Sequence, residues 1–330
     1  MAGKYVIGVD GGNTKTDYFL FDINGTFIDH IRAGTCSHEA LPGSYEQTYK
    51  VMSHYINRLL ENSNITIDDV DSGAFGLAGA DVPSQKLKLT EVIEKIGFKK
   101  FAMDNDSFLG IKAGTTKGFG VCSVNGTGTV AGGIDKHGNR LQVGGIGDIV
   151  GDKAGGSYIA RRAIDAVYGE LYRCGAPTKM TKPVMELLKV DDKYYFVEAV
   201  SENLTTRKVP SLEFIQAVFD SADDNDEVAT HILKDVALDL AKSTAGCINN
   251  LEFDNVVEVV LVGSVWVKAS TPIILDSYKK YMKKLTPKRC EFILLTVPPA
   301  TGAVLWALEL SKGSPVSPQI KQKIINAVHI

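Results

Sequence analysis

Two glycine-rich turns in this chain have the residue types of a phosphate-binding site. The first follows the apolar run that ends at Asp10 and reads DGGNTKT. Glycines let backbone N–H groups approach an anion, hydroxyls and a lysine add donors, and Asp10 can hold a hydrated Mg²⁺ ion. The phosphate-binding candidates here are Gly11, Gly12, Asn13, Thr14, Lys15 and Thr16, with Asp10 for the metal. An ordinary β-hairpin with a Gly-Gly turn is the alternative for this segment alone.

The second turn lies about 115 residues later, between segments of the same kind. It reads NGTGT and separates strand-like runs at 119–124 and 130–134, as the first turn separates runs at 5–10 and 16–22. We therefore expect a repeated meander whose two turns face each other and hold one polyphosphate. The candidates in this turn are Gly126, Thr127 and Gly128. Glycine turns between strands are common, so a coincidental likeness stays open.

Four aspartates could serve as a base that activates a hydroxyl group. They are Asp104, Asp106, Asp148 and Asp152. Asp106 ends a strand-like run and opens a helical pattern, a position at a sheet edge where ligands bind; a helix N-cap is the alternative role. Asp152 lies in the segment 144–156, which has six glycines in thirteen residues, Gly145 among them. Ordering so many glycines costs backbone entropy, which favours a functional role for the segment.

The strand-like run 256–262 ends at Gly263 and Ser264. A glycine at this point would let a flat ring such as adenine approach the backbone, which makes both residues candidates for a nucleotide-base site. A simple strand-to-helix turn would have the same sequence, so both interpretations stay open.

The elements that must position these residues alternate between strand and helix. In the first half, a third strand-like run at 27–33 precedes helical patterns from Ser44 and at 84–96, with a short strand at 100–103 between this pattern and the helix after Asp106. The second half repeats the meander and continues with a helical stretch through 157–250. Hairpin strands followed by alternating helix and strand predict an α/β fold.

The length of 330 residues suits two domains of ordinary size. We expect an N-terminal domain over 1–117 and a C-terminal domain over 118–313. The break at Lys312–Pro315 predicts that a last helix within 314–330 leaves the second domain and completes the first.

Composition argues against nucleic acid and membrane surfaces as partners. The 36 basic and 39 acidic residues leave a net charge of −3, which is too small for a strongly attractive field. No run of about 18 apolar residues occurs. The cysteines are odd in number and far apart: Cys36, Cys122, Cys174, Cys247 and Cys290. We therefore expect a cytoplasmic protein with reduced thiols, a small-molecule substrate and a homodimeric assembly.

The ordered set of motifs resembles the N-acetylglucosamine kinase branch of the BadF/BadG/BcrA/BcrD ATPase family, which belongs to the wider actin, hexokinase and Hsp70 fold. The matching motifs are the turn at 10–16, Asn105–Asp106, Asn125–Thr129, the loop at 144–152 and Val262–Trp266. They extend over nearly the whole chain and are weakest across about 170–250. The ordered set is much more specific than any single motif.

This resemblance implies two RNase H-like domains with ATP in the cleft between them. Asp106 matches the family's catalytic base, which takes the proton from the sugar hydroxyl that attacks the γ-phosphoryl group. Gly263 and Ser264 match the adenosine site, and the two glycine turns match the phosphate loops. The residues matched to sugar contacts are Ser37, His38, Gly79, Asp81, Asp106, Gly145 and Asp152. We expect an ATP- and Mg²⁺-dependent kinase acting on the 6-hydroxyl of N-acetylglucosamine, N-acetylmuramic acid or both.

Two departures from the family pattern fall on the sugar side. Lys153-Ala154-Gly155 stands where the family usually has Glu-Gly-Ser, and Ser37 stands where asparagine is common. Neither affects ATP use, but both leave the preferred sugar open. A cation at Lys153 could favour an acidic sugar such as N-acetylmuramic acid; a solvated lysine is the alternative.

Two other functions are compatible with the same fold. The first is an ATPase that activates a 2-hydroxyacyl-CoA dehydratase. Such activators hold an iron–sulfur cluster between subunits through cysteines, and the scattered cysteines of this chain offer no evident ligand set. The second is a non-catalytic regulator that binds a sugar or a nucleotide. The presence of Asp106 argues against the second.

Overall fold

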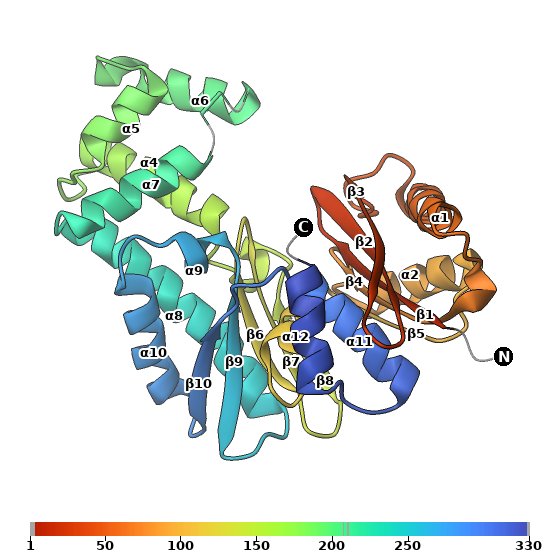
Figure 1. Cartoon of the computed structure of the whole chain (residues 1–330). Helices are drawn as coiled ribbons and strands as arrows, with labels where there is room; N and C mark the ends of the chain where they lie inside the picture. The colour runs from red at the N-terminus through yellow and green to blue at the C-terminus, as the bar shows by residue number, and fades with distance from the viewer. Residues whose placement is uncertain (1–3, 207, 210, 329–330) are drawn as a thin grey trace.

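Two five-stranded sheets form the framework of this computed structural model, which describes residues 4–206, 208–209 and 211–328 (Figure 1). The first sheet contains β1 (Tyr5–Gly11), β2 (Lys15–Asp22), β3 (Phe27–Gly34), β4 (Val70–Leu77) and β5 (Phe101–Asp104). The second contains β6 (Gly120–Asn125), β7 (Thr129–Ile134), β8 (Arg140–Gly144), β9 (Val256–Val262) and β10 (Arg289–Leu294). The strands of both meanders lie within about one residue of the positions expected from sequence.

Both sheets have the same topology. The strand order is β3-β2-β1-β4-β5 in the first sheet and β10-β9-β6-β7-β8 in the second, which is the same arrangement read from the opposite end. In each sheet an antiparallel three-stranded meander is followed by two parallel strands. The α/β fold class and the repeated meander expected from sequence are therefore confirmed.

Helices cover the faces of both sheets. Those of the first half are α1 (Ser44–Asn62), α2 (Pro83–Ile96) and α3 (Ser107–Gly114), with the short 3₁₀ helix η1 (Ile67–Asp69). The second half contains α4 (Gly156–Tyr172), α5 (Thr181–Leu188), α6 (Phe196–Thr206), α7 (Ser211–Asp223), α8 (Glu227–Asn250), α9 (Ser264–Lys268), α10 (Ile273–Leu285), α11 (Ala300–Lys312) and α12 (Pro318–Ala327), with η2 (Asp148–Val150) and η3 (Lys193–Tyr195). Over the described residues, none of these helices is long and apolar enough to cross a membrane.

The outer face of the first sheet is covered by α1 and α2. On α1, the buried residues Met52, Ile56 and Leu59 recur at helical spacing and share one core with Ile7 and Phe75 of the sheet. This packing fixes β1 and β4, at whose carboxyl ends the first turn and the loop after Leu77 begin.

Helices α3 and α11 pack against each other between the two sheets. Helix α11 contacts β1 and β4 of the first sheet, whereas α3 contacts β6, β7 and β9 of the second. A Cβ atom at Gly302 of α11 would lie 2.0 Å from the carbonyl oxygen of Leu109, so only glycine permits this approach. Helix α11 lies within the range 118–313 that we assigned to the second domain, yet it contacts the first sheet and α3.

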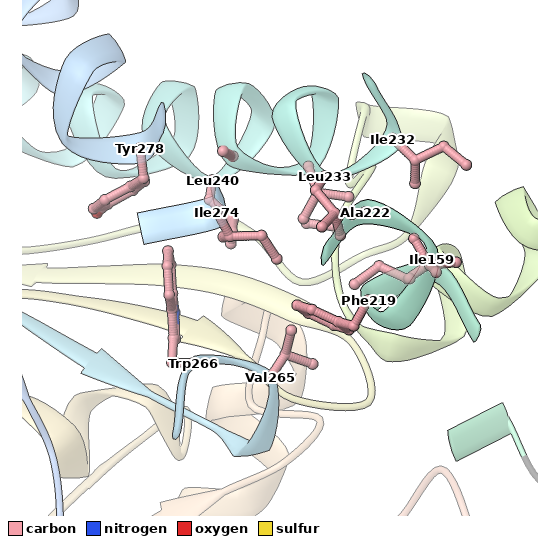
Figure 2. Packing of buried hydrophobic residues seen from close by; sticks show 14 of the residues in the cluster. Ile159, Phe219, Ala222, Ile232, Leu233, Leu240, Val265, Trp266, Ile274 and Tyr278 are labelled. Carbon is pink, nitrogen blue, oxygen red and sulfur yellow. The ribbon is translucent and has the colours of Figure 1, made fainter. Parts of the chain in front are cut away.

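The outer face of the second sheet is covered by α8, α9 and α10. Figure 2 shows Trp266 of α9 and Tyr278 of α10 pointing toward each other, with Leu240 of α8 nearby. The ring centroids of Trp266 and Tyr278 are 5.0 Å apart, and the indole N–H of Trp266 donates to the carbonyl oxygen of Ser123 at 3.1 Å. This packing holds the start of α9, and with it Gly263 and Ser264, against β6.

Candidate active site

The first phosphate-binding candidate is the hairpin turn between β1 and β2. The Gly12 N–H donates to the carbonyl oxygen of Lys15 at 2.9 Å, which closes the turn. Asn13, Thr14 and Lys15 are exposed at its tip, as a ligand-binding turn requires. Thr16 differs from them: it is fully buried, and its hydroxyl oxygen accepts a hydrogen bond from the Cys36 N–H at 3.0 Å. Thr16 therefore stabilises the turn from the protein interior and does not face a ligand.

The second turn is supported by the start of α4. The N–H groups of Gly156 and Ser157 donate to the carbonyl oxygens of Gly126 and Thr127 at 2.8 and 3.0 Å. The buried side chain of Asn125 accepts a hydrogen bond from the Gly155 N–H at 3.1 Å. These bonds satisfy N–H groups that a helix start leaves unpaired, and they connect the turn to the glycine-rich loop.

Gly263 lies directly against this second turn. Its φ of +115° is in the region that favours glycine, and a Cβ atom there would lie 2.4 Å from the carbonyl oxygen of Asn125. The structure thus brings the base-site candidates Gly263 and Ser264 next to the turn at 126–128. Over the described residues, no hydrogen bond or ion pair joins this turn to the first one.

Asp10 and Asp106 are two partly buried carboxylates that interact with each other. Burial, followed by the charges of Asp106 and Asp17, raises the pKa of Asp10 to about 7. A backbone hydrogen bond from Ala300, at the start of α11, and the charge of Lys15 oppose that shift. Because this carboxylate is desolvated and surrounded mainly by other acids, its site suits a cation.

The single carboxylate of Asp10 suits Mg²⁺ better than it suits a metal ion whose ligands all come from the protein. Mg²⁺ commonly binds one or two carboxylates and takes its other ligands from water and substrate phosphates. Within the described residues, no three His, Cys, Asp or Glu side chains gather closely enough to hold a metal. One carboxylate beside a candidate phosphate-binding turn matches the Mg²⁺ pattern.

Asp106 stands at the N-cap position of α3 but makes no capping hydrogen bond. The cap is supplied by the preceding residue, because the side-chain oxygen of Asn105 accepts from the Ser107 N–H at 2.9 Å. Burial and the charge of Asp81 raise the pKa of Asp106 to about 6. The carboxylate of Asp106 is therefore available to a ligand, and the capping alternative is not supported.

Asp81 gathers several of the sugar-side candidates. Its Oδ1 atom accepts from Asn105 Nδ2 at 2.9 Å and from Gln142 Nε2 at 2.6 Å. A Cβ atom at Gly145 would lie 3.3 Å from the same oxygen. Burial raises the pKa of Asp81 above its ordinary value, and its charge in turn acts on Asp106.

His38 lies next to this group. Its ring stacks on Tyr45 with centroids 4.3 Å apart, and a Cβ atom at Gly79 would lie 2.7 Å from its Cε1 atom. Burial lowers the pKa of His38, so its neutral form is favoured. Its Nδ1 atom is buried and finds no hydrogen-bond partner in the described part of the chain. Ser37 is buried beside it. The structure therefore brings His38, Gly79, Asp81 and Gly145 close to one another, with Ser37 next to His38, and the charge of Asp81 acts on Asp106.

Asp152 has a different position from the other sugar-side candidates. Its Oδ2 atom accepts from the N–H groups of Gly145, Ile146 and Gly147 at 2.9, 2.9 and 2.7 Å. The residue is 8% exposed. Asp152 thus shapes the loop that carries Gly145. The exposed Lys153 follows, and its backbone N–H donates to Asp239 at 2.9 Å.

The remaining candidates for the general base, Asp104 and Asp148, make ion pairs with basic side chains. Asp104 is buried, and its two oxygens accept from Lys86 at 2.5 Å and from Arg140 at 3.1 Å. Asp148 is half exposed and pairs with Arg161 at 2.7 Å. Of the four aspartates considered as a base, Asp106 is the one that makes neither an ion pair nor, as Asp152 does, three backbone hydrogen bonds. The backbone N–H groups of Ser107 and of Asp106 itself oppose the rise of its pKa.

The sequence did not single out Gln142 or the cations at Asp104. Gln142 and Arg140 lie on β8, an edge strand of the second sheet, and reach acids of the first half of the chain. Their alternation with Leu141 and Val143 marks one side of the strand as polar, but the partner of that side depends on how the two sheets pack.

A cavity of about 300 Å³ lies between the second turn and the glycine-rich loop. Its lining includes Gly128, Gly145, Asp152 and Arg161. It joins the phosphate-binding candidates of the second half to the loop near the sugar candidates.

Comparisons with known proteins give the family of this chain and two of its relatives. The profile of the BadF/BadG/BcrA/BcrD ATPase family matches residues 7–307. An N-acetylmuramic acid/N-acetylglucosamine kinase of Clostridium acetobutylicum is 26% identical over 306 residues, which cover 92% of this chain and 98% of that protein. An N-acetyl-D-glucosamine kinase of Dictyostelium discoideum is 26% identical over 322 residues, covering 94% of this chain and all of that one.

Solved structures support the fold. A protein of Chromobacterium violaceum, provisionally named an N-acetylglucosamine kinase, superposes with a TM-score of 0.65 at 17% identity, covering 92% of this chain and 99% of that one. A ROK family glucokinase of Streptomyces griseus, bound to glucose and AMPPNP, superposes with a TM-score of 0.55 at 16% identity. The match covers 94% of this chain and 100% of that one. The two sheets are thus those of the two-domain fold shared by actin-like ATPases and sugar kinases. The chain belongs to the BadF/BadG/BcrA/BcrD ATPase family.

Proposed function

We propose that this protein is an ATP-dependent kinase that phosphorylates the 6-hydroxyl of an N-acetylated amino sugar: N-acetylglucosamine, N-acetylmuramic acid or both. The observation that carries the proposal is the position of Asp106. Its carboxylate makes no cap and interacts with Asp10 on the phosphate side and with Asp81 on the sugar side. The names of two relatives that match almost end to end support this reaction.

In this mechanism Asp106 accepts the proton of the sugar hydroxyl as its oxygen attacks the γ-phosphorus. A general base works best when its pKa lies near the working pH. With a pKa of about 6, Asp106 is a stronger base than an ordinary aspartate and is still mostly ionised at neutral pH. Such a base contributes roughly 10²- to 10⁴-fold to the rate.

The rest of the catalysis is positioning and charge stabilisation. The phosphates would be held by Gly11 to Lys15 and by Gly126 to Gly128. Thr16 would stabilise the first turn by accepting the Cys36 N–H, and Gly263–Ser264 would contact the adenosine. Asp10 would hold Mg²⁺, which when bound neutralises phosphate charge. Ser37, His38, Gly79, Asp81 and Gly145 would contact the sugar, and Asp152 would act through the loop at 145–147. Closure of the two halves would exclude water, which competes with the sugar as acceptor.

The setting of this reaction is also part of the proposal. We propose a cytoplasmic homodimer with domains at 1–117 and 118–313 and a return of the last segment to the first. Lys323 of α12 supports that return, because it donates to Thr26 of the first half at 2.9 Å. The five cysteines are free, which supports a reducing compartment. Apolar side chains exposed on α6, such as Leu204 at 71%, support an assembly of copies.

The structure does not favour the alternative function as a dehydratase activator. A cluster shared between subunits needs cysteines that can reach a partner. Cys36, Cys122 and Cys247 are buried, and Cys290 is partly buried, which leaves Cys174 as the one exposed thiol of the five.

The experiment that tests the proposed function is a substrate panel with purified protein. ATP consumption and product mass are measured with N-acetylglucosamine, N-acetylmuramic acid, N-acetylmannosamine, glucosamine and glucose. We expect a phosphorylated product from at least one of the first two sugars at the highest kcat/KM of the panel. ATP turnover that no sugar stimulates would contradict the proposal, and the ratio between the first two sugars reports the preference.

A further inference from the structure

Strand β8 carries two polar side chains that reach across to the first half of the chain. Arg140 and Gln142 are two residues apart and therefore lie on the same side of the strand. Val143, on the other side, packs against the core of the second half. Arg140 donates to the buried Asp104, and Gln142 donates to Asp81.

The carboxamide of Gln142 is held in one orientation. Its Nε2 atom lies 2.6 Å from Asp81 Oδ1 and 3.2 Å from the carbonyl oxygen of Gly144, and both are acceptors. Turning the amide over would place Oε1 against these two oxygens and leave them without a donor. The nitrogen must therefore face Asp81, and the oxygen must point elsewhere.

The Oε1 atom is buried and has no hydrogen-bond partner among the residues that the structure describes. A buried acceptor without a donor costs roughly 1–3 kcal/mol, so such atoms usually have a ligand or water as partner. The atom lies beside the sugar-side candidates, since its own side chain contacts Asp81 and the first residue of the glycine-rich loop. A Cβ atom at Gly145 would lie 2.9 Å from the Nε2 atom of Gln142.

We propose that Gln142 is a sugar-binding residue that also joins the two halves of the site: its N–H groups hold Asp81 and Gly144, and its Oε1 atom accepts a hydrogen bond from the sugar. The donor is a hydroxyl or the acetamido N–H group of the substrate. With Asn105 and Gln142 both on Asp81 Oδ1, the second oxygen of Asp81 is left for the sugar. This inference rests on the proposed function as a sugar kinase.

The test compares two variants at this position with a matched control. Gln142→Leu removes donor and acceptor at similar volume. Gln142→Glu keeps an acceptor but places a second carboxylate against Asp81. Gln216→Leu is the control, because Gln216 is an exposed residue of α7 whose amide likewise donates to a carboxylate, Asp220, at 2.8 Å. KM for sugar, KM for ATP, kcat and melting temperature are measured for each.

We expect Gln142→Leu to raise the KM for N-acetylglucosamine about tenfold to a hundredfold, the effect of leaving one or two buried hydrogen-bonding groups unpaired. Gln142→Glu should lose more, because two carboxylates then face each other. The melting temperature of both variants should fall by about a few degrees, because Asp81 and Gly144 lose a hydrogen-bond donor. KM for ATP should stay close to wild type, and the control should change neither sugar nor ATP kinetics. If the donor is the acetamido N–H, the loss is smaller with glucose; if it is a hydroxyl, both sugars lose equally.

An unchanged sugar KM in both variants would overturn the inference, as would equal rises in the KM for sugar and the KM for ATP, which indicate a structural role only. These outcomes differ from failure of the proposed function. In that case the wild-type protein itself phosphorylates none of the sugars.

Discussion

The hydrogen bonds of Asp152 predict that this residue holds the glycine-rich loop in place. The perturbation is Asp152→Asn, which keeps the size of the side chain and removes its charge. In the wild-type protein one carboxylate oxygen accepts three backbone N–H groups at 2.7 to 2.9 Å. Asp152 as a whole is 8% exposed, so water cannot easily replace these bonds.

The size of the effect follows from these three bonds. A hydrogen bond to a charged acceptor contributes about 1.5–3 kcal/mol, and one between neutral groups about 0.5–1.5 kcal/mol. Replacing the carboxylate by an amide therefore costs roughly 1 kcal/mol per bond, or about 3 kcal/mol in all. At 1.4 kcal/mol per factor of ten, the loop should open about a hundredfold more often.

Amide hydrogen exchange of peptides that cover 144–151 measures this opening directly. We expect exchange in Asp152→Asn to be about a hundredfold faster in these peptides, with a higher KM for the sugar. Asp148→Asn is the matched control in the same loop: its ion pair with Arg161 is half exposed, so exchange should change little. Wild-type exchange rates in Asp152→Asn would refute the account of the loop.

Two further predictions concern Asp106 and Gly263. Because Asp106 must be ionised to act as a base and has a pKa of about 6, kcat/KM at saturating Mg²⁺ should fall as pH drops through 6 rather than 4. Because the pKa of Asp106 is higher in the folded protein than in the unfolded chain, its ionisation opposes folding at pH values above the unfolded-state pKa. Asp106→Asn should lose turnover but still bind sugar. Its free energy of unfolding should exceed that of wild type by about 1–3 kcal/mol at pH 7.5 but not at pH 4. Turnover near wild type would exclude Asp106 as the base. Gly263→Ala should raise the KM for ATP at least tenfold while the sugar KM stays within about twofold, because the added Cβ meets the Asn125 carbonyl at the second turn; equal effects on both would contradict this placement.

Local patterns made the two meanders predictable from sequence. Alternating apolar residues and glycine turns specify hairpins over short distances, and the same pattern occurs twice. Helix α11 was not predicted, although the sequence from Ala300 has good helix formers. Ala300 to Leu308 are all buried between α3 and the first sheet, so the helix lacks the polar face by which an amphipathic helix is recognised.

The candidate site was predictable only in part, for a different reason. Asn105 and Asp106 are both common capping residues, and the sequence alone does not say which of them caps α3. In the structure the Asn105 side chain does so and Asp106 does not. Gln142 was missed because its partner Asp81 comes from the other half of the chain, and no local pattern reports contacts that arise from the packing of two sheets.

The central claim is that this protein transfers the γ-phosphoryl group of ATP to the 6-hydroxyl of an N-acetylated amino sugar. The most direct test is to incubate the purified protein with Mg²⁺, ATP and N-acetylglucosamine or N-acetylmuramic acid, and to locate the phosphate on the product by ³¹P and ¹³C NMR. We predict stoichiometric ADP and a sugar phosphate whose C6 carbon shows coupling to phosphorus. ADP released with free phosphate and unmodified sugar, or a phosphate on another oxygen, would contradict the account.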